Sequence, residues 1–145
     1  MEQWKEWYGE AKGEKLDEVF EFLEPYMMEA GVTLEESTQI KISVEELLVN
    51  VASYAYEDNW TSDEKHLGKV IVKCGFSEKD NLFYVALEDW GKPYNPLEQD
   101  EPDITLSAEE RRIGGLGILM VKTMMDQVQY EYKEGKNCIL IAKNI

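Results

Sequence analysis

Two pairs of short apolar runs, each pair joined by a polar turn, constrain the fold of this chain more than any other feature. The first pair is Lys69–Phe76 and Leu82–Glu88, joined by Ser77–Asn81, and the second is Val128–Lys133 and Cys138–Lys143, joined by Glu134–Asn137. Short apolar runs bounded by turn residues predict β-hairpins. Because the two strands of a hairpin run in opposite directions, we expect a sheet that is mostly antiparallel.

Helical periodicity surrounds these hairpins. Within Lys15–Ala30, apolar residues recur at helical spacing and Gly31 closes the segment. Thr33 and Glu36 form a capping-box pattern that starts a second helix, which we expect to run to about Glu57. A third apolar segment follows a group of glycines and should be helical to about Gln127. The N-terminal WKEWY is a candidate edge strand.

This order of elements contains no alternation of strand, helix and strand, so it predicts an α+β fold. We expect a two-layer sandwich, in which helices cover one face of a mixed, mostly antiparallel sheet. The length of 145 residues suits one domain spanning 1–145. No internal repeat or linker divides the sequence.

Charge and composition exclude several classes of function. The net charge of −15 argues against direct binding to nucleic acid or to an anionic membrane, and is compatible with a basic protein partner. No run approaches the roughly 18 apolar residues of a membrane span. Cys74 and Cys138 lie in strand-like runs without a secretory segment before them, which predicts a reducing cytoplasm and buried thiols, with a disulfide left open. The single histidine, His66, argues against zinc sites and a Ser-His-Asp triad.

The second helix carries the first candidate site. Glu46 and Asn50 are four residues apart, so they are neighbours on one helix face. They belong to a polar stripe bordered by Ile42 and Val49, and a second polar stripe carries Lys41 and Glu45. One stripe should face solvent and the other could line a pocket. A carboxylate can act as a general base and an amide oxygen can bind Mg²⁺.

Two further stretches suggest ligand contacts. EDWGKPYNP (88–96) places an acidic residue and a glycine at a strand end, which suits recognition of a base edge but also an ordinary turn. RRIGGLGI (111–118) places three glycines before a helix, which suits either a phosphate cradle or a tight loop. The glycine stretch is not a Rossmann fingerprint, because residue 120 is methionine, and no P-loop motif occurs in the sequence.

Taken in order, these three stretches resemble the GHKL ATPase superfamily, and within it the anti-sigma-factor serine kinases of bacterial partner-switching systems. VEELLVNVASYAY (44–56) resembles the N box, EDWGKPYNP the G1 box and RRIGGLGI the G2 box. The C-terminal helix and hairpin are also similar, so the resemblance covers nearly the whole chain. Two positions depart from the pattern: Tyr54, where histidine is common, and Asn95, where aspartate is frequent.

The resemblance implies a histidine-kinase-like ATPase domain that uses ATP and Mg²⁺. It implies that Glu46 is the general base towards a substrate serine, that Asn50 binds Mg²⁺, and that Asp89 accepts from the adenine amine. It implies a lid over ATP at about 97–113. The nucleotide contacts that it implies are Asn50, Asp89, Gly91, Arg112, Gly114, Gly115, Leu116 and Gly117.

The implied function is that of an anti-sigma factor that phosphorylates a serine of an anti-anti-sigma (STAS-type) protein, also binds a sigma factor, and forms a homodimer. The alternative is a nucleotide-binding module that sequesters its partner without kinase activity. A histidine-kinase fragment is disfavoured, because His66 lies in a polar loop and no helical hairpin precedes the domain. An α+β domain without nucleotide is the remaining possibility.

Overall fold

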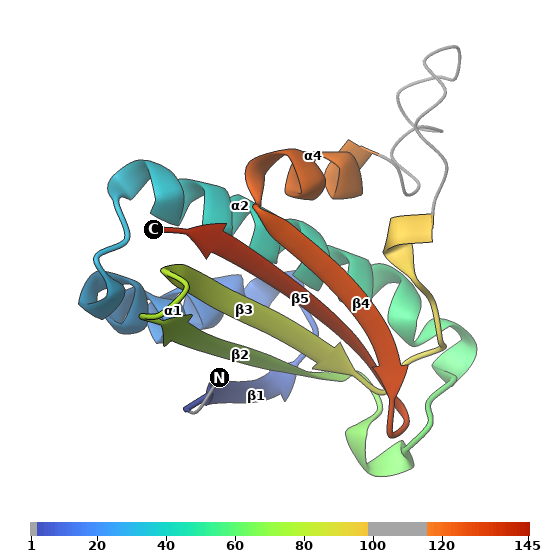
Figure 1. Ribbon diagram of the computed structural model, residues 1–145. Helices are drawn as coiled ribbons and strands as arrows, with labels where there is room; N and C mark the ends of the chain where they lie inside the picture. Colours follow the sequence, from blue (N-terminus) through green and yellow to red (C-terminus); the bar gives the residue numbers. More distant parts are fainter. Residues whose placement is uncertain (1–2, 99–115) are drawn as a thin grey trace.

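Helices cover one face of a five-stranded antiparallel sheet in the computed structural model, which describes residues 3–98 and 116–145 (Figure 1). The strands are β1 (Lys5–Glu10), β2 (Lys69–Ser77), β3 (Leu82–Asp89), β4 (Gln127–Lys133) and β5 (Lys136–Asn144), and the helices are α1 (Leu16–Ala30), α2 (Leu34–Asn50) and α4 (Leu116–Met124). The strand order is β1-β2-β3-β5-β4, and all four pairings are antiparallel. The predicted α+β fold class and the edge strand near the N-terminus are confirmed.

Local sequence signals set the α1–α2 hairpin as predicted. Val19, Leu23 and Met27 lie on one face of α1 and are buried against the sheet. Gly31 ends the helix with φ +80°, a conformation that glycine adopts without strain. Thr33 Oγ1 accepts from the Glu36 backbone at 3.2 Å, and Glu36 Oε1 accepts from the Thr33 backbone at 2.9 Å. This capping box supplies two of the hydrogen bonds that a helix start otherwise lacks.

The second helix changes its winding before its predicted end. Regular α-helix stops at Asn50, and Val51–Ala55 continues as a wider π-helical turn. Tyr56 then ties this segment to the sheet, because its hydroxyl donates to the Lys69 carbonyl at 2.6 Å and accepts from the Trp90 N–H at 2.9 Å. Tyr56 therefore joins the end of the helix to the start of β2 and the end of β3.

The last hairpin has a shorter turn than the sequence suggested. We expected a turn over Glu134–Asn137, but Glu134 and Gly135 close it alone, with φ values of +55° and +79°. Two consecutive positive φ values match the right-handed twist of a hairpin, so two residues suffice. As a result Asn137 lies inside β5, directly opposite Asp89. The helix before this hairpin also ends earlier than expected, at Met124.

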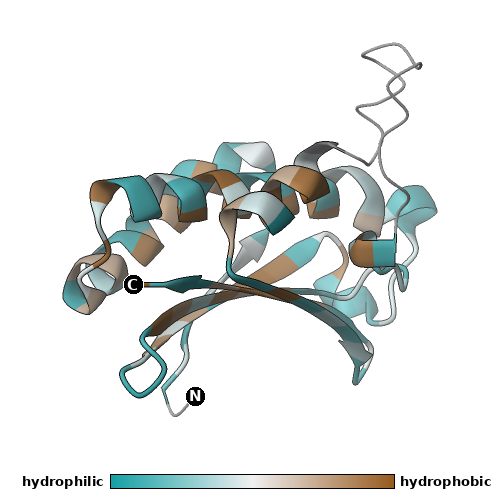
Figure 2. Ribbon diagram, turned by 45° about the horizontal axis from the view of Figure 1, so that its top comes forward, coloured by the Kyte–Doolittle hydropathy of each residue, from teal (hydrophilic) through white to brown (hydrophobic). Residues whose placement is uncertain are grey.

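The two faces of the sheet differ in their cover. Figure 2 shows the helices stacked over one face, where Phe83, Val85 and Leu87 enter the core. On the other face, Glu88 contacts Lys73 at 3.0 Å and Lys136 at 2.8 Å. These two lysines hold the pKa of the Glu88 carboxyl below its ordinary value, against the opposing effect of burial.

The two cysteines lie on opposite faces of the sheet. Cys74 is in the core, and burial raises the pKa of its thiol to about 12. Cys138 is half-buried opposite Glu88 on the uncovered face. Both are free thiols, so the disulfide that the sequence left open does not form. In the described part of the chain, the helices lack the combination of length and apolar character that crossing a membrane needs.

Candidate functional site

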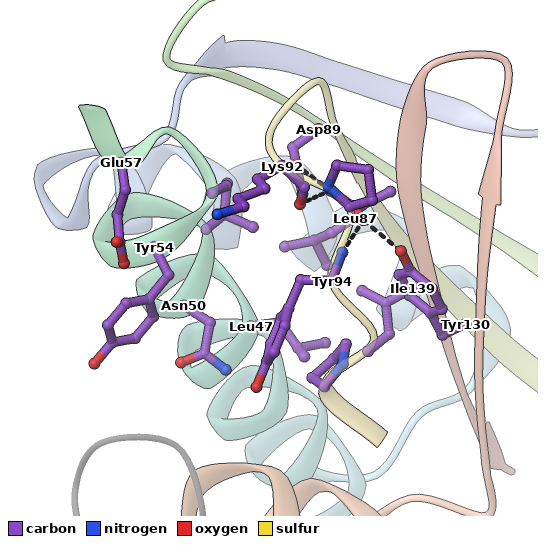
Figure 3. Close-up of a pocket in the computed structure, with 15 residues that line it drawn as sticks. Leu47, Asn50, Tyr54, Glu57, Leu87, Asp89, Lys92, Tyr94, Tyr130 and Ile139 are labelled. Atoms are coloured by element: carbon purple, nitrogen blue, oxygen red, sulfur yellow. Dashed lines mark hydrogen bonds between the residues drawn. The ribbon is translucent and has the colours of Figure 1, made fainter. Parts of the chain in front are cut away.

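A cavity of about 410 Å³ opens between the end of α2, the sheet and the loop that follows β3 (Figure 3). Asn50 and Tyr54 line one side of it, and Asp89, Tyr130 and Ile139 line the other. Apolar side chains of Leu47 and Leu87 also contribute to the wall. A cavity of this size, mostly apolar and with a few polar groups, is typical of a small-molecule site.

Asp89 is the buried acid of this cavity, with 6% of its surface exposed. It ends β3, and its Oδ1 accepts from the Gly91 N–H at 2.9 Å and from Asn137 Nδ2 at 3.0 Å. Burial raises the pKa of the Asp89 carboxyl, and these two hydrogen bonds oppose that rise. Oδ2 has no hydrogen-bond partner among the described residues. The carboxylate is therefore held by one oxygen, while the other remains available to a ligand.

Asn137 holds this acid in place and was not identified from the sequence. Its Nδ2 donates to Asp89 Oδ1, to the Gly91 carbonyl at 3.2 Å and to the Lys92 carbonyl at 3.0 Å. Its Oδ1 accepts from the Tyr94 N–H at 3.1 Å and from the Tyr130 hydroxyl. One side chain thus fixes both the carboxylate and the loop beside it. The sequence signal was misleading, because an asparagine two residues after glycine looks like part of a turn.

We expect Asn137→Ala to lower the free energy of unfolding by about 2–4 kcal/mol, because several buried hydrogen bonds are lost at about 0.5–1.5 kcal/mol each. Urea unfolding without nucleotide measures this loss. Asn144→Ala, at the exposed end of the same strand, is the control and should change stability little. A loss below about 1 kcal/mol in Asn137→Ala would mean that Asn137 does not organise the site.

Gly91 lies where two backbone segments meet. A Cβ at this position would be 2.6 Å from Ala55 Cβ and closer still to the Ala55 carbonyl oxygen. The Lys92 N–H donates to that same carbonyl at 2.8 Å. The loop after β3 is therefore docked on the π-helical turn, and a side chain at 91 would separate them. This packing by itself requires glycine at position 91.

The polar stripe of α2 that carries Glu46 and Asn50 faces inward. Ser43, on the same stripe, is fully buried, and its Oγ has no partner among the described residues. Glu46 and Asn50 are half-buried, whereas Glu45 on the other stripe is exposed. Asn50 lines the cavity, but Glu46 is one turn away and lies against Gly117 at the start of α4.

Three other residues at the cavity were not identified as site residues. Tyr54 and Tyr94 keep 39% and 48% of their surface exposed, as expected of side chains at the mouth of a cavity. Lys92 is the only cationic residue among those that line it in the described part of the chain. It offers positive charge to a ligand in a chain that is otherwise strongly acidic.

His66 lies outside the cavity. Its ring stacks on Trp90 with centroids 4.0 Å apart, and its Nδ1 lies 2.9 Å from the Tyr8 hydroxyl.

Part of the predicted site lies outside the described residues. This applies to Arg112, Gly114, Gly115 and nearly all of the predicted lid, 97–113. The start of α4 at Leu116 and Gly117 is described. The structure thus brings Asn50 and Asp89 to one cavity, and the Gly91 N–H donates to Asp89. Glu46 lies one helical turn before Asn50 on α2, against Gly117 of α4.

Comparison with known proteins gives a consistent result. The family model of the histidine kinase-like ATPase domain matches residues 9–143. A serine-protein kinase RsbW from Listeria innocua is 31% identical over 114 residues, covering 77% of this chain and 68% of the relative. An anti-sigma F factor from Clostridium novyi is 27% identical over 123 residues, covering 81% and 77% respectively.

Solved structures support the same fold. The SiaB–SiaC complex from Pseudomonas aeruginosa contains a chain that matches with a TM-score of 0.63 at 15% identity, covering 97% of this chain and 88% of that one. The RsbU and RsbW domains of a Mycobacterium tuberculosis protein match with a TM-score of 0.62 at 12% identity, covering 97% and 32%. At these identities the likeness concerns the fold alone.

Proposed function

Because the chain belongs to the family of histidine kinase-like ATPase domains, we propose that it binds ATP and transfers the γ-phosphoryl group to a serine of a partner protein. The family resemblance predicted from the three sequence motifs is confirmed by this membership. Relatives that carry the names serine-protein kinase and anti-sigma F factor support the same activity and an anti-sigma role.

The observation that carries the proposal is the buried Asp89 carboxylate in a cavity of nucleotide size. Two donors hold one of its oxygens, and the other can accept a hydrogen bond from the exocyclic amine of adenine. A charged acceptor in a buried site recognises such an amine strongly, and the lack of the amine leaves the carboxylate unpaired. Leu47, Leu87 and Ile139 supply apolar surface for the planar ring.

Asn50 fits a role in holding Mg²⁺ together with ATP. Magnesium is usually held by one or two protein oxygens together with substrate phosphates and water, and the Asn50 amide oxygen lies at the cavity. Within residues 3–98 and 116–145, no cluster of three His, Cys, Asp or Glu side chains competes for this role. When bound, the ion would offset the charge of the phosphates.

The remaining roles follow the order of the motifs. Glu46 is proposed as the general base that takes the proton of the substrate serine, one helical turn from Asn50. Arg112, Gly114, Gly115, Leu116 and Gly117 are proposed to contact the phosphates. Lys92 and the tyrosines at the cavity mouth, Tyr54 and Tyr94, are proposed to add contacts to the nucleotide, although the resemblance assigns them no role.

The proposed partners follow from the family resemblance. The serine to be phosphorylated belongs to an anti-anti-sigma protein of STAS type, and the same chain binds a sigma factor. The SiaB–SiaC structure is itself a complex between two proteins, which is consistent with a role in partner binding. The homodimer and the cytoplasmic location remain predictions.

One observation favours the second candidate, a nucleotide-binding regulator without kinase activity. Glu46, the proposed base, is not among the residues that line the cavity. In that case ATP would control partner binding without phosphate transfer.

Phosphate transfer is the direct test. The purified chain is incubated with Mg²⁺, γ-labelled ATP and the candidate anti-anti-sigma protein, with a serine-to-alanine form of the substrate as control. We expect label on the substrate serine and none on the control. ATP binding without any transfer, in the presence of a bound partner, would favour the regulator instead.

A further inference from the structure

Gly117, in the first turn of α4, lies directly against the Glu46 side chain of α2. A Cβ built on Gly117 would lie 3.1 Å from Glu46 Cδ and closer still to Glu46 Oε2. The carboxylate therefore rests against the Gly117 backbone, in space that any other residue would fill. In Figure 1, α4 lies beside α2, so this contact joins two helices that are far apart in the sequence.

The position of Glu46 on α2 explains why this contact matters. Side chains on a helix lean towards its N-terminus, and one turn in that direction Ser43 is fully buried. One turn in the other direction, Asn50 lines the cavity. The Glu46 carboxylate thus emerges between α2 and α4 at the edge of the site. Its place is limited on one side by Gly117.

We propose that Gly117 is a positioning residue for the Glu46 carboxylate, in addition to any contact of its backbone with nucleotide. This inference rests on the proposed role of Glu46 as general base. A base acts only within hydrogen-bond reach of the proton that it removes. Because residue 117 has no side chain, the Glu46 carboxylate can occupy the space beside the Gly117 backbone. A methyl group at 117 would push the carboxylate out of that space.

The two roles of Gly117 predict different kinetics for Gly117→Ala. If Gly117 acts through Glu46, kcat should fall by about 10–100-fold, because misplacement by about 1 Å can cost 10²-fold in rate. The Kd for ATP should change little. If Gly117 acts only by letting its backbone approach phosphate, ATP binding should weaken and the rate at saturating ATP should be kept.

We expect Gly117→Ala to fold as stably as the wild type, so a lower kcat would not reflect unfolding. Alanine is a better helix former than glycine by about 0.5–1 kcal/mol, so the substitution favours α4 itself. The flexible end of Glu46, rather than backbone, is the group that has to move. We expect the thermal unfolding midpoint of Gly117→Ala to equal or exceed that of the wild type.

The experiment combines kinetics with a direct view of the carboxylate. In the full chain, kcat and the Kd for ATP are measured for wild type, Gly117→Ala, Glu46→Asp and the double variant. Thr123→Ala, on the exposed part of the same helix, is the control. The side-chain carboxyl signal of Glu46 is followed by ¹³C NMR without nucleotide, and is assigned by its loss in Glu46→Gln.

We expect Gly117→Ala, but not Thr123→Ala, to move the Glu46 signal and to lower kcat at unchanged Kd. In the Glu46→Asp background the shorter side chain withdraws from residue 117, so Gly117→Ala should have no further effect on rate. Three results would overturn the inference. They are a Glu46 signal that Gly117→Ala leaves in place, weaker ATP binding in Gly117→Ala without a lower kcat, and an equal fall of kcat in the Glu46→Asp background. Failure of the proposed function is separate, because it appears as absent phosphate transfer in the wild type.

Discussion

Asp89→Asn should reduce ATP affinity by at least about 100-fold, since hydrogen bonds to charged groups contribute about 1.5–3 kcal/mol and the variant also creates a conflict between donors. The Asp89 carboxylate accepts from Gly91 and Asn137 on one oxygen and would accept from adenine on the other. An asparagine amide has one oxygen and one NH₂ group. Whichever way it turns, one of these donors meets an NH₂ group instead of an acceptor.

Calorimetric titration of ATP and of ADP in the presence of Mg²⁺ measures this effect. The matched control is Asp80→Asn, which makes the same change of charge in the exposed turn at the other end of β3. It should bind as the wild type does. If Asp89→Asn bound ATP with wild-type affinity while remaining folded, the assignment of the adenine site to this cavity would be wrong.

Glu46→Gln should lower the rate of phosphate transfer by about 10²–10⁴-fold, the contribution usual for a general base. The amide keeps the size of the side chain but cannot accept the serine proton. Since Glu46 is not among the residues that line the cavity, ATP affinity should stay within about threefold. Single-turnover transfer to the anti-anti-sigma protein, at saturating ATP, measures the rate.

Glu45→Gln is the control for this prediction, because the neighbouring residue carries the same charge and is exposed on the other stripe of α2. Its rate should equal that of the wild type. If Glu46→Gln lost ATP binding, the base role would be wrong and Glu46 would belong to the nucleotide site. If Glu46→Gln transferred phosphate at the wild-type rate, another group would have to be the base.

Much of the secondary structure could be predicted because its causes are local. The capping box at Thr33 and Glu36, the glycine that ends α1 and the alternating apolar runs of the hairpins each act within a few residues. The order of the three motifs along the sequence then indicated the family. The start of the wider turn after Asn50 had no such signal, because the sequence there continues to look helical.

Which polar stripe of α2 is buried could be learned only from the tertiary structure. The helix carries two polar stripes, and periodicity cannot tell which of them is buried. Packing against the sheet and α4 places Ser43 inside and leaves Glu45 exposed. The choice depends on contacts with residues far along the chain, such as Gly117.

The sequence by itself determined most of the elements, the fold class and the three motifs, since these depend on neighbouring residues and on known patterns. Only the tertiary structure decided that Asn137 lies opposite Asp89. A two-residue turn places Asn137 in β5, and the pairing of β5 with β3 then aligns it with the acid. The register depends on the pairing of β3 with β5, in which Asp89 faces Asn137 from 48 residues away in the sequence. A turn shifted by one residue would reverse the faces of β5 and point Asn137 away from the cavity.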